Sequence, residues 1–341
     1  MKNAKLAAIL SILLTTAIFV TSCGKTSQNG KDGKEQVTIN VFNWGDYIGE
    51  TTIADFEKAY PGIKVNYEDF STNEDMYVKI KTGASDYDVA IPSDYMIKRM
   101  IDEDLLCKIN MENIPNYKYI DDRFKALSYD PDNEYSVPYM WGTVGILYNK
   151  TMVSEPVDSW KILWDEKYSK EILGYSMNTK NIPELEEAKA KLIEQKPLVL
   201  AYVVDQVKDM MIGESAALAV VWSGDAYYCM SQNENLAYAI PKEGTNYWFD
   251  GMVIPKTSKH QKEAELFINF MCETNTAFNN AEYIGYATPH TEVIKMLDPD
   301  LTADRAAYPT EEDLENCEIF EYPGDEINRE YGRIWTEVKA Q

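Results

Sequence analysis

Asp250 lies at the centre of an aromatic stretch, residues 247–255, with the sequence Tyr-Trp-Phe-Asp-Gly-Met-Val-Ile-Pro. The apolar run 252–254, closed by Pro255, is typical of a short buried strand. A carboxylate between Trp248 and such a strand is costly to bury unless a positive group meets it. Two interpretations stay open: Asp250 caps a turn beside core aromatic residues, or it is a ligand carboxylate beside an aromatic wall suited to an organic cation.

Aromatic residues recur at the ends of predicted strands throughout the chain, and acidic residues are interleaved with them. A single residue of this kind is more often a packing residue than a ligand contact. Taken together, they predict a shared aromatic and acidic cleft. The aromatic residues are Trp44, Tyr47, Tyr95, Trp141, Trp222, Trp248 and Tyr286, and the acidic residues are Asp46, Asp225 and Asp250.

The other residues offer little catalytic or metal-binding chemistry. The chain has two histidines, His260 and His290, and lacks the motifs of serine hydrolases, zinc proteases, P-loop enzymes and dinucleotide-binding enzymes. The cysteines beyond residue 23, which are Cys107, Cys229, Cys272 and Cys317, are widely spaced without a zinc pattern, so we expect free thiols. One disulfide stays open as the alternative for an exported protein. We therefore expect no enzyme activity, cofactor or metal. A secreted glycosidase stays open as an alternative, because paired carboxylates have little local sequence signature.

The N-terminal segment predicts export from the cytoplasm. Lys2 and Lys5 precede an apolar run, residues 6–20, which predicts a signal peptide over 1–22. The placement of Cys23 resembles a bacterial lipobox and predicts a lipidated tether over 23–36; an ordinary signal peptide with an incidental cysteine is the alternative. The formal charge is −23 and becomes more negative without both lysines. That charge argues against nucleic-acid binding and favours the approach of cations.

The mature chain exceeds the ~250–300 residues that a single core usually spans, so we expect two lobes. Its first third alternates strands at 37–42, 63–67 and 87–91 with helices at 51–60, 73–82 and up to about 102. This predicts an α/β fold with a parallel sheet, whose ligands lie beyond the carboxyl ends of the strands. Later we expect helices at 183–195 and 206–212, strands at 198–204 and 216–221, and a helix that begins with a capping box of Ser258 and Gln261.

Six ordered motifs resemble those of the extracytoplasmic spermidine/putrescine-binding proteins of polyamine ABC transporters. They are Asn43-Trp44-x-x-Tyr47, Ser93-x-Tyr95, Val137-Pro138-Tyr139-Met140-Trp141-Gly142, Trp222-Ser223-Gly224, Trp248-Phe249-Asp250 with Val253-Ile254-Pro255, and Ile284-Gly285-Tyr286-x-Thr288-Pro289. The resemblance runs from about residue 37 to the C-terminus. It implies a two-lobe periplasmic-binding-protein (Venus-flytrap) fold with the ligand between the lobes. Lobe 1 would comprise 37–140 and 250–296, and lobe 2 would comprise 141–249 and 297–341.

The resemblance also implies a site and partners. By motif position, an aromatic box around the methylene chain of spermidine or putrescine is formed by Trp44, Tyr47, Trp222, Trp248 and Tyr286. Ser93 and Tyr95 would add polar contacts, and Asp250 would pair with an amine. The expected protein is a monomer, anchored by its lipid on the outer face of the cell membrane, that delivers its ligand to ABC permease subunits with their ATPase. A receptor for another small solute, such as a sugar, is the alternative.

The chain departs from this family after Glu171-Ile172-Leu173, where it continues directly with Gly174-Tyr175. Family members carry an acidic pair there, which binds one terminal amine, followed by a helix that packs lobe 2. We therefore expect lobe 2 to be shortened by about one helix and destabilised. One ammonium group of the ligand would lack its usual partner, which weakens binding or favours a shorter diamine. The family's polar contact near the C-terminus is also missing, with Phe320 about in its place.

Overall fold

The computed structural model describes residues 36–165, 167, 172–173 and 179–341. The predicted signal peptide, Cys23 and the predicted tether up to residue 35 lie outside the described residues. So do residues 168–171 and 174–178, which flank the position of the expected shortening. Within the described part of the chain, none of the helices has the length and apolar character needed to cross a membrane.

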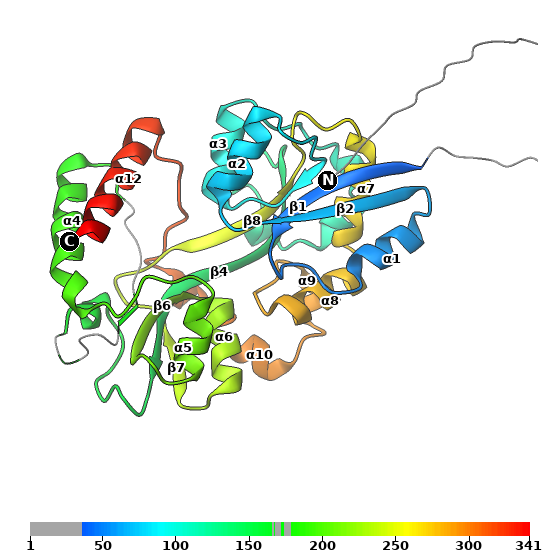
Figure 1. The fold of residues 1–341 in the computed structure, drawn as a ribbon. Coiled ribbons are helices and arrows are strands. Elements are labelled where there is room, and N and C mark those ends of the chain that lie inside the picture. The colour runs from blue at the N-terminus through cyan, green and yellow to red at the C-terminus, as the bar shows by residue number, and fades with distance from the viewer. Residues whose placement is uncertain (1–35, 166, 168–171, 174–178) are drawn as a thin grey trace, which may run out of the picture. The chain divides into compact units, whose positions relative to one another are not determined.

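The secondary structure alternates strands and helices in its first third (Figure 1). The strands are β1 (Val37–Trp44), β2 (Ile63–Phe70), β3 (Val89–Ala90), β4 (Ser136–Asn149), β5 (Ile172–Leu173), β6 (Leu218–Trp222), β7 (Leu236–Ala239) and β8 (Tyr247–Val253). The helices are α1 (Thr52–Ala59), α2 (Asn73–Thr82), α3 (Asp94–Asp102), α4 (Ile182–Gln195), α5 (Gln206–Ile212), α6 (Ser223–Gln232), α7 (Gln261–Met271), α8 (Thr274–Ile284), α9 (Thr291–Ile294), α10 (Pro299–Ala303), α11 (Glu311–Leu314) and α12 (Asp325–Ala340).

The strands form one mixed sheet in the order β2-β1-β3-β8-β4-β6-β5, with β7 also paired to β4. The predicted α/β fold is confirmed, and the predicted parallel pairing holds for β1 with β2 and β3. From β3 through β8 and β4 to β6 the pairing is antiparallel, because β8 returns between β3 and β4, and the last pair, β6 with β5, is parallel again. Strand β4 is long enough to pair with β8 along its first half and with β6 and β7 along its second half (Figure 1).

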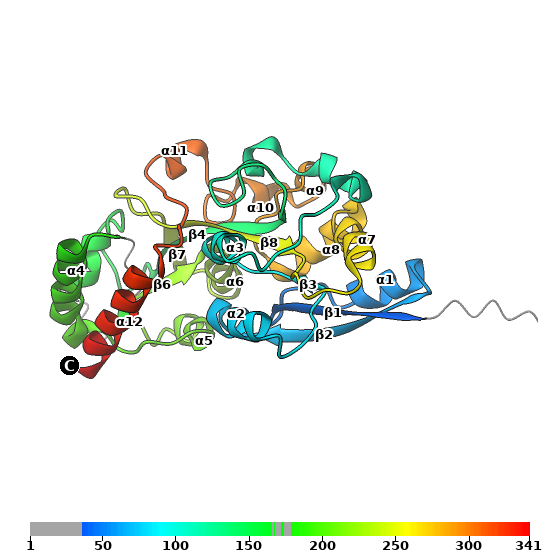
Figure 2. The ribbon, with the colours of Figure 1, turned by 90° about the horizontal axis from the view of Figure 1, so that it is seen from above.

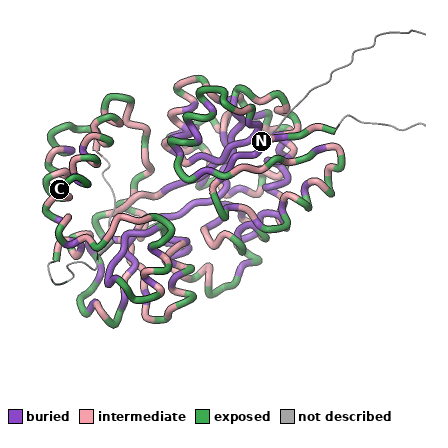
Figure 3. Tube along the Cα trace, in the orientation of Figure 1, coloured by how far each residue is buried: buried purple, intermediate pink, exposed green. Residues whose placement is uncertain are grey.

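The buried residues follow the strands (Figure 3), and they divide into several hydrophobic clusters. The largest takes its buried residues from 39–141 and 249–297. Two further clusters draw on residues 146–236 and cover the other end of the sheet. A fourth joins Leu185 of α4 to Ile334 and Val338 of α12, and these two helices lie side by side in Figures 1 and 2.

Local sequence signals explain both boundaries of helix α2. Helix α2 has the predicted bounds, because the side chain of Thr72 accepts a hydrogen bond from the backbone N–H of Asp75 at its start. Gly83 ends the helix in the left-handed region, with φ 64°, which a residue without Cβ adopts at little cost.

Two predictions of local structure are wrong. No strand forms over 198–204; instead a 3₁₀ turn (Lys196–Leu198) leads into irregular chain in which Leu200 and Val204 are exposed. The apolar run therefore does not mark a buried strand. The expected capping box is absent, because the Ser258 hydroxyl donates to Asp88 and helix α7 begins at Gln261 with His260 as its N-cap. A tertiary contact thus replaces the local cap.

Candidate functional site

Asp250 lies within β8, between β3 and β4, and its side chain is 5% exposed. Its Oδ2 accepts a hydrogen bond from the Tyr47 hydroxyl at 2.7 Å, and its Oδ1 accepts one from the Ser93 hydroxyl at 2.7 Å. No ion pair within the described ranges includes Asp250. The turn-capping interpretation is therefore wrong: Asp250 is a buried carboxylate held by two neutral donors on a central strand.

Burial raises the pKa of Asp250 from 3.8 to about 6, and the hydrogen bonds from Ser93 and Tyr47 limit that rise. Desolvation disfavours the charged form, whereas donors that point at the carboxylate favour it. Near neutral pH the group is therefore mostly ionised, with its negative charge removed from water and not matched by any cation of the described residues. Such a group binds a cation that brings its own positive charge.

The two hydroxyl donors are themselves held in place. Ser93 Oγ accepts a hydrogen bond from Asn73 Nδ2 at 3.1 Å, and the Ser93 backbone N–H donates to Asn73 Oδ1 at 3.1 Å. Because Asn73 occupies one lone pair of Ser93, the single hydroxyl hydrogen is directed to Asp250. The Tyr47 carbonyl accepts from Tyr139 at 2.9 Å, which fixes the loop after β1. The sequence analysis missed Asn73 and Tyr139, whose roles depend on contacts between distant segments.

A second buried carboxylate, Asp94, fixes the start of α3 to β8. Its Oδ1 accepts from the Tyr95 backbone N–H at 2.6 Å, and its Oδ2 accepts from the Phe249 backbone N–H at 3.0 Å. Burial raises the pKa of Asp94 well above its ordinary value, and the charge of Asp250 adds to that rise. Asp94 therefore positions Asp250 through the neighbouring peptide, a role that the sequence signalled only as an acid in the first turn of a helix.

Three of the predicted aromatic residues meet beside Asp250. Tyr286 lies edge-on to Tyr47 with ring centroids 5.9 Å apart, and edge-on to Trp248 at 5.1 Å. Two glycines permit this packing: a Cβ on Gly224 would lie 2.3 Å from Tyr286 Cδ1, and a Cβ on Gly142 would lie 2.8 Å from Trp248 Cζ2. We call Tyr47, Trp248 and Tyr286 the aromatic cluster.

The other predicted residues lie in different surroundings. Trp44 is partly buried against Phe70, with ring centroids 4.5 Å apart, and the Tyr95 hydroxyl donates to Glu74 at 3.0 Å. Trp222 is 38% exposed at the end of β6, immediately before the residues that meet Tyr286. The prediction that Trp141 lines the same cleft is wrong, because its ring packs in the core against the rings of Phe124, Tyr247 and Tyr308 and not against the aromatic cluster.

Asp225 adds a second carboxylate at the edge of the aromatic cluster. It lies in the first turn of α6, one residue after the glycine on which Tyr286 packs, and its side chain is 16% exposed. Burial raises the pKa of Asp225, while Lys208 and the Tyr286 hydroxyl act to lower it. Lys208 Nζ lies 3.6 Å from Asp225 Oδ1. Unlike Asp250, Asp225 therefore already has a cation of the protein beside it.

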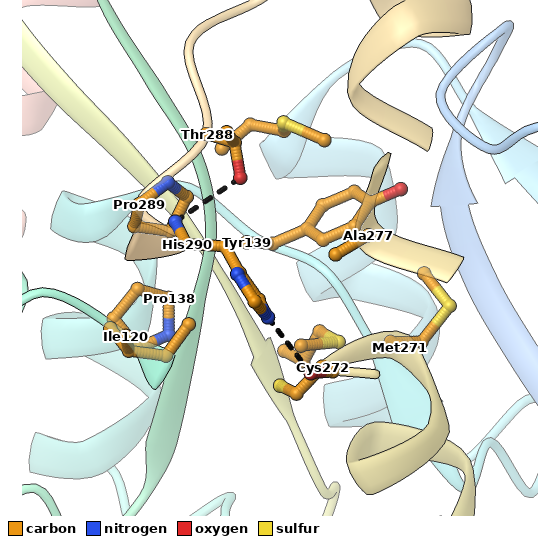
Figure 4. A pocket seen from close by; sticks show the side chains of 11 residues that line it. Ile120, Pro138, Tyr139, Met271, Cys272, Ala277, Thr288, Pro289 and His290 are labelled. Atoms are coloured by element: carbon orange, nitrogen blue, oxygen red, sulfur yellow. Dashed lines mark hydrogen bonds between the residues drawn. The ribbon is translucent and has the colours of Figure 1, made fainter. Parts of the chain in front are cut away.

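Two cavities elsewhere do not mark this site. A cavity of about 10 Å³ lies against His290, whose Nε2 contacts the Cys272 carbonyl at 3.1 Å and whose backbone N–H donates to Thr288 (Figure 4). It holds at most one water. A second cavity, of about 330 Å³, has among its lining residues Val144, Trp160, Trp164, Leu192, Glu243 and Phe320. None of the eight predicted ligand residues is among the described residues that line either one.

Comparison with known proteins gives a consistent result. A family model described as bacterial extracellular solute-binding protein matches residues 51–310. The spermidine/putrescine-binding periplasmic protein of Salmonella typhimurium is 32% identical over 323 residues, which cover 89% of this chain and 92% of that protein. The putrescine-binding periplasmic protein PotF of Escherichia coli is 26% identical, with 97% of each chain covered.

A solved structure extends the comparison to three dimensions. The spermidine/putrescine ABC transporter substrate-binding protein PotD from Streptococcus pneumoniae is 40% identical in sequence, with 89% of this chain and 99% of that chain covered. The TM-score is 0.78. Because it covers 89% of this chain, the similarity concerns the whole fold rather than one motif.

Proposed function

The chain belongs to the bacterial extracellular solute-binding protein family, and on that premise we propose that it is the polyamine-binding component of an ABC importer. The observation that carries the proposal is Asp250, a buried carboxylate with two hydroxyl donors and, within the described residues, no cation. A ligand ammonium group supplies the missing charge and forms charge-assisted hydrogen bonds.

The aromatic residues suit the rest of a polyamine. A polyamine is an apolar methylene chain with separated ammonium groups, and aromatic faces can cover the methylenes while each cation–π contact adds roughly 0.5–2 kcal/mol. We assign this role to the aromatic cluster together with Trp44, Tyr95 and Trp222. Asp225 lies at the edge of the cluster beside Tyr286, and we assign it the second ammonium group. This partly replaces the acidic pair that the chain lacks.

The proposal includes a two-lobe mechanism without catalysis. Lobe 1 comprises 37–140 and 250–296, and lobe 2 comprises 141–249 and 297–341. The division of the core supports these bounds, since the largest hydrophobic cluster draws on 39–141 and 249–297. The lobes close around the ligand by a hinge motion. A monomeric protein, anchored through a lipid on Cys23 at the outer face of the cell membrane, then delivers the ligand to the permease and its ATPase.

Calorimetric titration of residues 24–341 with spermidine, putrescine and a neutral sugar tests the function. We expect at least one polyamine to bind with micromolar affinity, which corresponds to about −8 kcal/mol, and the sugar to give no signal. Binding of the sugar, or no polyamine binding by a domain that melts cooperatively, would contradict the proposal. Turnover of a chromogenic glycoside that is lost in Asp250→Asn would support the glycosidase alternative instead.

A further inference from the structure

The ion pair between Lys208 and Asp225 is loose and partly exposed. Helix α5 carries Lys208, the first turn of α6 carries Asp225, and the two helices pack against each other. The distance from Nζ to Oδ1 is 3.6 Å, and the two side chains are 32% and 16% exposed. A well-formed contact between an ammonium group and a carboxylate is about 2.7–2.9 Å long. A second ammonium group could therefore form a shorter contact with Asp225 than Lys208 does.

The position of this ion pair connects it to the ligand site. Gly224 lies beneath the ring of Tyr286, and the Tyr286 hydroxyl acts on Asp225 by lowering its pKa. Tyr286 in turn contacts Tyr47, which donates to Asp250. One carboxylate thus lies on each side of Tyr286, and they differ in one respect: Asp225 has a lysine beside it, whereas Asp250 forms no ion pair in the described part of the chain.

We propose that Lys208 is a built-in competitor for the second ammonium group of the ligand. This inference rests on the proposed function and adds a determinant of specificity to it. An ammonium group at Asp250 displaces no cation of the described residues, whereas a second one at Asp225 must first displace the Lys208 ammonium. Lysine can move because its flexible stem lets the charged group extend into water. Lys208 therefore weakens the binding of diamines and triamines and leaves the binding of monoamines unchanged.

Titration of four proteins with putrescine and with n-butylamine tests the competition. The proteins are the wild type, Lys208→Met, Asp225→Asn and the double variant, all as residues 24–341. We expect Lys208→Met to bind putrescine about fivefold more tightly, the upper end of what one partly exposed ion pair contributes. The affinity for n-butylamine should stay within about twofold. The gain should disappear in the Asp225→Asn background, because a coupling between two side chains vanishes once either is removed.

Lys189→Met is the matched control for the loss of one positive charge. Lys189 pairs with Glu186 and Glu337 between α4 and α12, so its removal should change neither affinity. If Lys208→Met is unstable, Lys208→Gln, which keeps a polar end, replaces it and should show the same gain in putrescine affinity.

Each result is decisive. Equal putrescine affinity in all four proteins overturns both the role of Lys208 and the assignment of the second ammonium group to Asp225, while polyamine binding itself stands. A gain that persists without the Asp225 carboxylate overturns the role of Lys208 alone. A gain of equal size for n-butylamine overturns it too, because it would reflect net charge alone. Absence of putrescine binding in all four folded proteins overturns this inference, and it overturns the proposed function as well if spermidine also fails to bind.

Discussion

Replacing Asp250 with asparagine should strongly weaken ligand binding and yet stabilise the ligand-free protein at neutral pH. The pKa of Asp250 is about 6 in the folded protein, against 3.8 for an unperturbed aspartate. A carboxylate whose pKa is raised in the folded state does not lower the free energy of unfolding below about pH 3.8, where it is protonated in both the folded and the unfolded state. The cost grows as the pH rises to about 6 and is complete above that value. Two pKa units correspond to about 3 kcal/mol.

Asparagine removes this cost but weakens the hydrogen bonds from Tyr47 and Ser93, because one carboxylate oxygen becomes an NH₂ group. That loss offsets about 1 kcal/mol, which leaves a net gain of about 2 kcal/mol in the free energy of unfolding at pH 7.5. For a chain of this size the gain corresponds to a rise of about 4 °C in Tm. Polyamine affinity should fall by about thirtyfold or more, since truncating one partner of a buried charge pair costs at least about 2 kcal/mol.

Scanning calorimetry of both proteins at pH 4 and pH 7.5 measures this difference. The proteins must first be unfolded, dialysed and refolded, because bound ligand would stabilise the wild type alone. Asp130→Asn is the matched control: four donors already satisfy the buried Asp130 carboxylate, so this variant should have a lower Tm at pH 7.5. An Asp250→Asn protein whose Tm is lowered equally at both pH values would refute the reasoning, because the carboxylate would then carry no uncompensated charge.

Three further predictions concern the pH, a glycine and an arginine. Polyamine affinity should fall about tenfold between pH 7.5 and pH 5, because protonation of Asp250, with a pKa of about 6, competes with the ligand. Calorimetric titration at both pH values measures this fall. The affinity of the Asp250→Asn variant should not change with pH. Gly224→Ala should weaken polyamine binding about tenfold or more, because the added Cβ displaces Tyr286. The control Gly62→Ala, with nothing within 4 Å of the added Cβ, should bind polyamine with the affinity of the wild type. Arg99→Met should lower the free energy of unfolding by about 1–2 kcal/mol in urea titrations, because Arg99 pairs with Glu103 and lies over the rings of Tyr77 and Tyr322. The control Lys98→Met removes a more exposed pair and should lower the free energy of unfolding by less than about 0.5 kcal/mol. Equal losses in the two variants would contradict the expected role of burial.

The sequence predicted the features that depend on neighbours along the chain. The apolar run before Pro255 predicted a buried strand, and Gly83 predicted the end of α2. It did not predict which donors meet Asp250, because Tyr47 and Ser93 are 203 and 157 residues away in sequence. Asn73 and Asp94 were missed for the same reason: each is an ordinary first-turn residue of a helix until the sheet brings it to Ser93 or β8. The exposed Leu200 and Val204 show that an apolar run alone does not determine burial.

Asp250 and Asp225 lie on elements that belong to different hydrophobic clusters of the core, and this difference affects how strongly a ligand favours the closed form of the protein. Asp250 and its donors belong to the strands and helices of the largest hydrophobic cluster, whereas Asp225 belongs to α6, whose buried residues lie in another cluster. A ligand shifts a conformational equilibrium only by its difference in affinity for the two states. A monoamine at Asp250 contacts one cluster, so its affinity depends little on the distance between the carboxylates. A diamine that reaches both carboxylates forms its second contact only when the distance between Asp250 and Asp225 matches its length, and Lys208 reduces the affinity gained from that contact. In the proposed importer, ligands with two ammonium groups therefore favour the closed form. Replacement of Lys208 should increase the difference between diamines and monoamines both in affinity and in the fraction of protein that is closed.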